Sequence, residues 1–385
     1  MNVSLMAQTL TSEVLIVGGG VIGLAIARKL HRRGVNDITI IDKGTCGHEA
    51  SWAAAGMLSP QAETDEAGPF LDLCLRSRDL YPQFADELLN EAGVDIELDR
   101  KGTLALAFDD DDGRRLLDRL HWQRDAGLDV ETMSAEEIIK LEPNLSALIQ
   151  FGVYFPNDWQ VENRRLIEAL RRYAEINGIR VLENTAVDRL IVDDIRVIGA
   201  TTANSAIHAG STILATGAWT SLIKMGDAAM PVKIEPVRGQ IVCLQSRPGL
   251  LEHVICTHRG YLVPRRDGRI LAGSTSENVG FDASTTSEAL TSLTEMVKKI
   301  VPAEPLEIID HWGGLRPFAA DGLPLLGGLS GLDGLMVATA HYRNGILLAP
   351  LTAAIVADKL IDGIEDTAFT TFGLDRFSLA ASTLA

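Results

Sequence analysis

The stretch VLIVGGGVIGLAIARKL, residues 14–30, constrains the fold more than any other part of this sequence. A β-branched apolar run enters three glycines, and a run with helical apolar spacing follows and ends near Gly34. Gly18, Gly20 and Gly23 form the pattern G-x-G-x-x-G between the predicted strand and the predicted helix. The first glycine permits a tight turn and the second lets the backbone approach a diphosphate. The third permits close packing of the helix on the strand.

A second strand with an acidic end completes this pattern. DITIIDKG reads as a buried strand that ends at Asp42 and Lys43, and Asp42 lies 19 residues after Gly23 (42 − 23). An acidic side chain at this position can accept hydrogen bonds from a ribose hydroxyl. The unit therefore predicts a dinucleotide whose diphosphate lies at the helix N-terminus, with Val21 and Ile22 in the site. FAD and NAD share this fingerprint, so the glycines do not choose between them.

Charge and cysteine content exclude several classes of protein. The 385 residues carry a formal net charge of −17, which argues against nucleic acid or an anionic membrane as a partner. The four cysteines show neither C-x-x-C pairing nor metal-ligand spacing, so we expect free thiols and no metal site. The N-terminus lacks a signal-peptide pattern, and no apolar run approaches the roughly 18–20 residues of a membrane helix. We therefore expect a cytoplasmic protein.

The order of the patterns predicts an α/β protein of two domains. The opening is a strand–helix–strand unit, and the last third returns to a strand, a polar loop and a long helix. Between them, alternating patches at residues 231–309 predict an antiparallel sheet. We expect a discontinuous nucleotide-binding domain of Rossmann-like fold at 1–80, 150–225 and 310–375. An antiparallel-sheet-rich substrate domain is expected at 81–149 and 226–309.

Five stretches resemble the glycine oxidase branch of the D-amino-acid-oxidase superfamily of FAD-dependent oxidoreductases. They are EASWAAAGMLSPQAE (49–63), ILATGAW (213–219), GYLVPR (260–265), GGLRPFAADGLPLLG (313–327) and HYRNGILLAP (341–350). Together with the opening glycines they follow the family's order from residue 13 to about residue 360. The resemblance implies a nucleotide-binding domain of the glutathione-reductase type.

The resemblance also implies FAD as the cofactor, held non-covalently, because no cysteine follows Cys256 near the third motif. Small side chains and free backbone N–H groups at residues 51–57 suit close packing on a diphosphate and a flat ring. A loop before the last helix would place backbone N–H groups and a helix N-terminus near the flavin pyrimidine carbonyl. The implied contacts are Ser51, Ala53, Ala54, Ala55, Gly56, Met57, Val187, Thr216, Gly217, Trp219, Arg343, Asn344, Gly345, Ile346 and Leu347, beside Lys43.

Residues for a small amino-acid substrate follow from the same resemblance. Arg316 matches the arginine that clamps the substrate carboxylate, Tyr261 matches the tyrosine that supports it, and Arg343 matches a third active-site residue. The alternatives are a surface arginine, a half-buried strand tyrosine and a loop salt bridge, respectively. Met57 contacts the flavin or substrate, or else fills the core. Arg259 stands where some relatives carry a histidine, and we expect it near the substrate entrance, where it could favour a second anionic group.

The predicted reaction is oxidation of glycine, and of sarcosine or small D-amino acids, by hydride transfer from Cα to flavin N5. Oxygen would accept the electrons, giving the 2-oxo acid, ammonia or amine, and hydrogen peroxide, with the imine feeding thiazole assembly for thiamine. The alternative is a dehydrogenase for D-amino acids or hydroxyproline that passes electrons to a quinone. A third reading is an inactive flavin-binding scaffold. By family analogy we expect a homo-oligomer, namely a tetramer.

Overall fold

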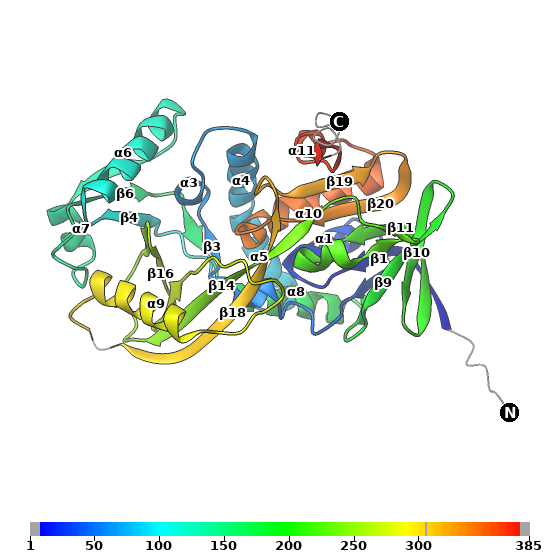
Figure 1. Cartoon of the computed structure of the whole chain (residues 1–385), viewed down its shortest axis with the longest axis horizontal. Helices are drawn as coiled ribbons and strands as arrows, with labels where there is room; N and C mark the ends of the chain where they lie inside the picture. Colours follow the sequence, from blue (N-terminus) through cyan, green and yellow to red (C-terminus); the bar gives the residue numbers. More distant parts are fainter. Residues whose placement is uncertain (1–7, 305, 378–385) are drawn as a thin grey trace.

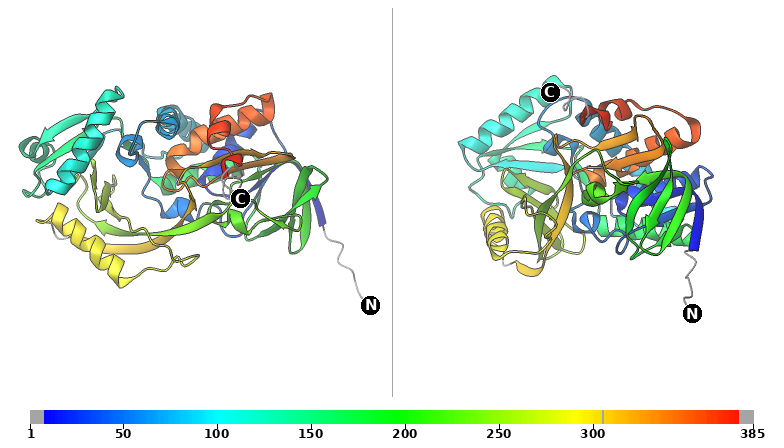
Figure 2. Two further views of the ribbon diagram at one scale, coloured as in Figure 1. Left: turned by 45° about the horizontal axis from the view of Figure 1, so that its top comes forward. Right: turned by 45° about the vertical axis from the view of Figure 1, so that its right-hand side comes forward.

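Two large β-sheets with helices packed on them form the part of the chain that the computed structural model describes, residues 8–304 and 306–377 (Figure 1). The long strands β14 (Ile234–Gln245) and β18 (Glu307–Ala319) pair along their whole length. They run from the smaller sheet toward the larger one (Figures 1 and 2). This α/β architecture with a second, sheet-rich part confirms the predicted fold class.

The larger sheet has a parallel centre. The strands β20 (Leu332–Thr339), β11 (Ser205–Leu214), β1 (Gln8–Val17), β2 (Ile38–Ile41) and β8 (Arg180–Leu182) lie side by side in this order, each parallel to the next. Beyond and beside β20 lie β9 (Val187–Asp193), β10 (Arg196–Thr202), β12 (Lys224–Met225), β13 (Ala228–Ala229) and β19 (Leu325–Leu329). The predicted opening unit is therefore confirmed as β1, α1 (Val21–Arg32) and β2.

The last four residues of strand β1, Val14 to Val17, are apolar because both faces of the strand are covered there. Val14 and Ile16 pack with the helices, whereas Leu15 and Val17 pack against residues from the strands on the other face. A continuous apolar run is the pattern expected for a central parallel strand. On the helical side, α1 contacts both α10 (Gly345–Asp362) and α8 (Asn163–Ile176). Around them lie α4 (Pro69–Asp79), α5 (Tyr81–Ala92) and α11 (Thr367–Thr371).

The smaller sheet is mostly antiparallel. Its order is β18, β14, β17 (Arg269–Gly273), β16 (Gly260–Pro264), β15 (Val254–Thr257), β4 (Thr103–Ala107), β6 (Phe151–Phe155) and β5 (Glu131–Ser134). The helices α6 (Asp110–Asp125), α7 (Ala135–Leu141) and α9 (Ser287–Ile300) lie beside it (Figure 1). Short elements join the two sheets, namely α2 (Ala50–Ala53), β3 (Met57–Leu58), α3 (Pro60–Glu63), β7 (Trp159–Gln160) and the 3₁₀ turn η1 (Gly217–Leu222).

Helix α9 departs from the sheet predicted for residues 231–309. Its buried side chains Leu293, Met296, Val297 and Ile300 recur at helical spacing and pack on the apolar face of the smaller sheet. The side chain of Thr286 accepts a hydrogen bond from the Ala289 N–H and caps the helix. Strands β14 to β17 lie in the predicted region, and the helix interrupts the sheet between β17 and β18.

The strands of the two sheets do not follow the predicted domain ranges in every case. Strands β6 and β18 belong to the smaller sheet, although residues 150–155 and 310–319 were assigned to the nucleotide-binding part. The domain ranges themselves stay a prediction.

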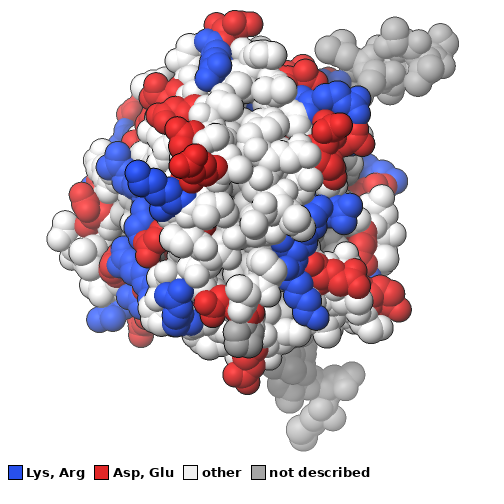
Figure 3. Space-filling model, turned by 90° about the vertical axis from the view of Figure 1, so that its left-hand side faces the viewer, with Lys and Arg blue, Asp and Glu red and all other residues white. Residues whose placement is uncertain are grey.

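Charged side chains of both signs are interspersed on the face formed by the left-hand end of Figure 1, as Figure 3 shows. None of the described helices is both long enough and apolar enough to cross a bilayer.

Candidate functional site

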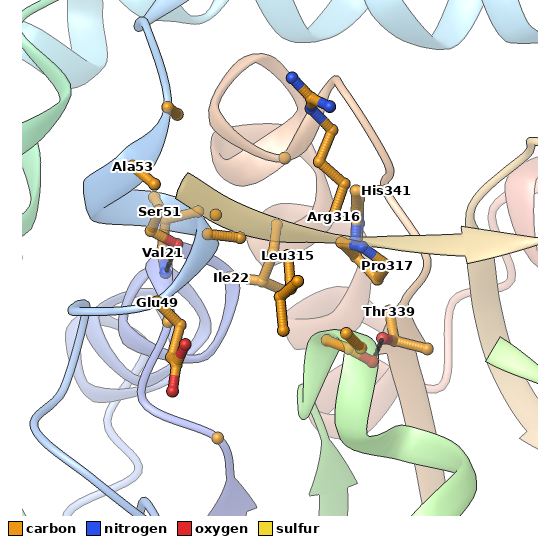
Figure 4. A pocket seen from close by; sticks show the side chains of 18 of the residues that line it. Val21, Ile22, Glu49, Ser51, Ala53, Leu315, Arg316, Pro317, Thr339 and His341 are labelled. Carbon is orange, nitrogen blue, oxygen red and sulfur yellow. Dashed lines mark hydrogen bonds between the residues drawn. The ribbon is translucent and has the colours of Figure 1, made fainter. Parts of the chain in front are cut away.

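A cavity of about 390 Å³ brings most of the predicted site residues together, from segments that lie far apart in the sequence. Its lining comes from the glycine turn, residues 49–57, the ends of β9 and β11, strands β14, β16 and β18, and the loop before α10. Figure 4 shows one side of it, with Val21, Glu49 and Ser51 near one another and Arg316 extending from β18.

The glycine turn at one wall is as close-packed as the spacing predicts. Gly18 has φ +106°, and a Cβ there would overlap the Ala215 carbonyl of the neighbouring strand. A Cβ at Gly23 would overlap the Gly18 carbonyl, so Gly23 serves the turn without lining the cavity. At Gly20 a Cβ would meet only the Ser51 Oγ, at 3.4 Å. The turn therefore offers open backbone at Gly20, where α1 begins.

Asp42 and Lys43 lie beside this turn. The Asp42 carboxylate accepts hydrogen bonds from the N–H groups of Gly19 (2.7 Å) and Gly44 (2.8 Å), one on each oxygen. It therefore fixes the turn and keeps lone pairs for a further donor. The Lys43 ammonium lies 3.9 Å from the centroid of the Trp219 ring and pairs with Glu49.

The segment 51–57 is held by its carbonyl groups from the side away from the cavity. The Asn163 amide donates to the carbonyls of Ser51 (2.9 Å) and Trp52 (3.0 Å), and the Trp312 indole donates to the Ala53 carbonyl (3.0 Å). The buried Arg265 guanidinium donates to the Ala55 carbonyl at 2.8 Å. Ser51, the alanines 53–55, Gly56 and Met57 consequently line the cavity with small atoms.

Two helices begin at the cavity without a side-chain cap. The first N–H of α1, from Val21, donates to the Ser51 Oγ at 3.1 Å, and α10 starts at Gly345 after Asn344. Uncapped first turns present N–H groups and the positive end of the helix dipole. Asn344, Gly345 and Ile346 line the cavity, but Leu347 is fully buried in the core beneath it.

The far end of the cavity holds Arg316, which is half-buried. Its Nη1 donates to the Thr275 carbonyl (3.1 Å) and its Nη2 donates to the Ser274 hydroxyl (2.7 Å). Among the described residues no carboxylate lies within ion-pair distance of this guanidinium. Burial lowers the pKa of Arg316, and the charge of Arg343 lowers it further. The guanidinium lies over Gly239, where a Cβ would overlap it.

Tyr261 and Arg343 lie at the same end. The buried Tyr261 ring lies across Gly273, whose Cβ would come within 2.7 Å of the tyrosine hydroxyl. Arg343 makes a two-point ion pair with Glu63, from Nε to Oε2 (2.7 Å) and from Nη2 to Oε1 (3.2 Å). The salt-bridge alternative weighed for Arg343 is therefore present, at a position that also lines the cavity.

His341 lines the cavity as a neutral group. Burial lowers its pKa to about 3, and its Nε2 lies 3.1 Å from the Thr352 hydroxyl. This contact gives the histidine a structural role.

Arg259 lies outside the cavity, contrary to its expected place near the substrate. It stands in the β15–β16 turn, where its Nε donates to His258, and Asp112 and Lys299 are close by. Gly260, with φ +146°, follows Arg259 and is the first residue of β16. Arg259 is only two residues before Tyr261 in the sequence, but the two residues line different cavities.

The remaining predicted cofactor contacts, Val187, Thr216, Gly217 and Trp219, line the cavity near Asp42 and the glycine turn. Several site residues were not predicted from the sequence. The other end of the cavity is lined by Glu63, Gly239, Ser274 and Tyr342, and segment 51–57 is supported from behind by Asn163 and Arg265. Glu63 and Arg265 occur in the stretches that carry the resemblance, but nothing local in the sequence marks their partners.

An extended dinucleotide fits this arrangement. The backbone at Gly20 is open, two uncapped helix N-termini face one cavity, and an acid lies at the end of β2. A small-residue wall at 53–57 suits a flat ring next to the Arg316 end.

Comparison with known proteins supports a site for a dinucleotide cofactor. The profile of the family described as FAD dependent oxidoreductase (DAO) matches residues 13–359. A glycine oxidase from Pseudomonas aeruginosa is 35% identical over 92% of this chain and 96% of its own length. A bifunctional protein ThiO/ThiG from Synechocystis is 35% identical over 95% of this chain, which spans 54% of that protein. The crystal structure of glycine oxidase from Geobacillus kaustophilus superposes with a TM-score of 0.87 at 35% identity and covers 95% of this chain and 98% of its own.

The family profile and these relatives cover nearly the whole chain, and the cavity fits the cofactor that defines the family. The protein therefore belongs to the DAO family of FAD-dependent oxidoreductases.

Proposed function

We propose that the protein oxidises glycine, and sarcosine or small D-amino acids, to the 2-oxo acid and ammonia or amine, with oxygen reduced to hydrogen peroxide. The observation that carries the proposal is the half-buried Arg316 guanidinium, which lines the cavity with no carboxylate partner among the described residues. An arginine in such a place is suited to a two-point hydrogen bond with a substrate carboxylate. The glycine oxidase relatives support glycine as the substrate.

Different segments along the cavity would hold different parts of FAD. The backbone at Gly20 and the start of α1 would hold the diphosphate of FAD, and Asp42 a ribose hydroxyl, with no covalent bond to the protein. Segment 51–57 and the start of α10 would hold the flavin. FAD, when bound, supplies a two-electron acceptor at its N5.

At the substrate end of the cavity, positioning of the substrate would matter more than a catalytic base. Arg316 would orient the carboxylate and Tyr261 would add a hydroxyl donor, while Met57 would complete the wall. His341 is neutral and hydrogen-bonded to Thr352, which makes it unsuited to take the amine proton. The enzyme would thus act on the fraction of substrate whose amine is already neutral.

The visible spectrum of the purified protein, followed by peroxide assays with glycine, sarcosine, D-alanine and D-proline, tests this function. Flavin bands and peroxide from glycine under air are expected. Bleaching under nitrogen with dye reduction but no peroxide would instead assign a dehydrogenase. A flavin that no amine bleaches would leave only the scaffold reading. A role of the imine in thiazole assembly, a cytoplasmic location and a tetramer are further parts of the proposal, for which the ThiO/ThiG relative and family analogy are the support.

A further inference from the structure

The ion pair between Glu63 and Arg343 controls how many positive charges face the substrate end of the cavity. Both side chains line it, and two hydrogen bonds of 2.7 and 3.2 Å bind them together. The Glu63 charge raises the pKa of Arg343 well above its usual value. Arg343 is thus a fixed cation whose charge is matched by one carboxylate.

Arg316 is the other arginine at this end, and it has no such partner among the described residues. Tyr261 and Tyr342 lie near both arginines. The lining residues Asp42, Lys43 and Glu49 lie at the other end, around the glycine turn and Trp219. The substrate end therefore carries two arginines and one carboxylate, a net charge of about +1.

The short helix that ends at Glu63 is anchored to the rest of the protein. Glu63 is the last residue of α3, and the buried Asp158 carboxylate accepts hydrogen bonds from the Gln61 N–H (3.1 Å) and the Ala62 N–H (2.7 Å). The Gln61 side chain is itself hydrogen-bonded to Gln123 at 2.9 Å. A carboxylate on such a support does not simply swing away from Arg343 when a second anion arrives.

We propose that Glu63 determines the charge class of the substrate: by occupying Arg343 it restricts the site to amines with one carboxylate and excludes those with a second anionic group. This inference rests on the proposed function for the part played by Arg316. A net charge of +1 matches one carboxylate, and a second one would meet Glu63 in place of a free guanidinium. Without Glu63 the same cavity would present two free arginines.

Ligand binding tests this without turnover. Acetate, malonate and succinate are titrated into the FAD-loaded protein, and dissociation constants are read from the change in the flavin absorption spectrum. The wild type is expected to bind acetate more tightly than either dicarboxylate. In Glu63→Gln, which keeps the shape of the side chain, the ratio of dicarboxylate to acetate affinity is expected to rise about tenfold, the effect of one released charge in a partly solvated site.

Two variants serve as controls. Asp65→Asn removes a carboxylate two residues away that pairs with Arg119 and does not line the cavity, so its ratio should equal that of the wild type. The double variant Glu63→Gln/Arg343→Gln returns the net charge to about +1 and should lose the gain. In turnover, Glu63→Gln should raise kcat/KM for iminodiacetate relative to glycine.

A wild type that binds malonate or succinate as tightly as acetate would overturn the inference, even if no variant folds. An unchanged affinity ratio in Glu63→Gln, or an equal rise in Asp65→Asn, would overturn it as well. Failure of the proposed function is seen separately: the wild type then gives no peroxide from glycine, whereas the anion titrations still report on Glu63.

Discussion

Gly239 sets the position of the Arg316 guanidinium, and Gly239→Ala tests whether that position matters. A Cβ at 239 would overlap the Nη1, Nη2 and Cζ atoms of Arg316, so the side chain must move. The backbone at Gly239 has no positive φ, and the overlapping atoms are the far end of a flexible side chain. The chain should therefore fold, with free energy of unfolding changed by less than about 1 kcal/mol.

The magnitude follows from what the moved guanidinium would lose. A two-point charge-assisted hydrogen bond to a carboxylate contributes about 1.5–3 kcal/mol, which corresponds to a roughly 10- to 150-fold loss of kcat/KM for glycine. FAD affinity should change little, because the atoms nearest to the new methyl group all belong to Arg316.

Steady-state kinetics with glycine, a flavin titration and a thermal melt make up the assay. Gly328→Ala, in β19 and remote from the cavity, is the matched control, because a Cβ there meets only the Leu335 carbonyl at 3.4 Å. Arg316→Met gives the scale for complete loss of the clamp. If Gly239→Ala bound FAD and kept the wild-type kcat/KM for glycine, the placement of the clamp at Arg316 would be refuted.

Three further substitutions probe other parts of the site. Tyr261→Phe keeps the buried ring over Gly273 but removes the hydroxyl, so KM for glycine should rise about fivefold with little change in Tm. An unchanged KM would remove Tyr261 from the substrate contacts. A lysine at position 265 cannot keep the four hydrogen bonds of Arg265, which go to Gln160, Val161, Ala55 and Asn163. For Arg265→Lys we therefore expect a loss of about 3 kcal/mol in stability together with weaker FAD binding. Wild-type FAD affinity would show that Ala55 needs no such support. Burial raises the pKa of Asp158 from 3.8 to about 7. Its proton is therefore held more tightly in the folded state, and stability falls as pH rises from about 4 to about 7, by roughly 4 kcal/mol. Asp158→Asn should flatten this dependence in denaturant titrations at pH 5 and pH 8, and an equal difference between the two pH values in both proteins would contradict the assignment.

Local patterns predicted the nucleotide half of the site well, because its parts are neighbours in sequence. Gly18, Gly20, Gly23 and Asp42 lie within 25 residues (42 − 18 + 1), and the turn that they form needs little from the rest of the chain. The positions of Arg316, Tyr261 and Arg343 came from the family resemblance, since nothing local marks them. Their placement in one cavity agrees with that expectation, while their roles stay proposals.

Contacts between residues far apart in the sequence could not be predicted, because no local pattern marks them. Glu63 and Arg343 are 280 residues apart, and Arg265 is 210 residues from the Ala55 carbonyl that it binds. Neither pair carries a local signal, because the sequence around an arginine is the same whether its guanidinium donates to water or to a buried oxygen. Arg259 was expected near the substrate entrance from the family resemblance, whereas the structure places it in the β15–β16 turn, outside the cavity that Tyr261 lines.

The register of β14 and β18 explains how the two ends of the cavity are kept together. Gly239 lies directly opposite Gly314 in this antiparallel pair. Gly239 makes room for the Arg316 guanidinium, and a Cβ at Gly314 would meet the Cβ of Ala53 at 2.5 Å. One cross-strand pair of glycines thus lets the Arg316 guanidinium and the small-residue wall approach the same strands. The pairing of these two strands therefore fixes the distance between the predicted flavin wall and the predicted substrate clamp.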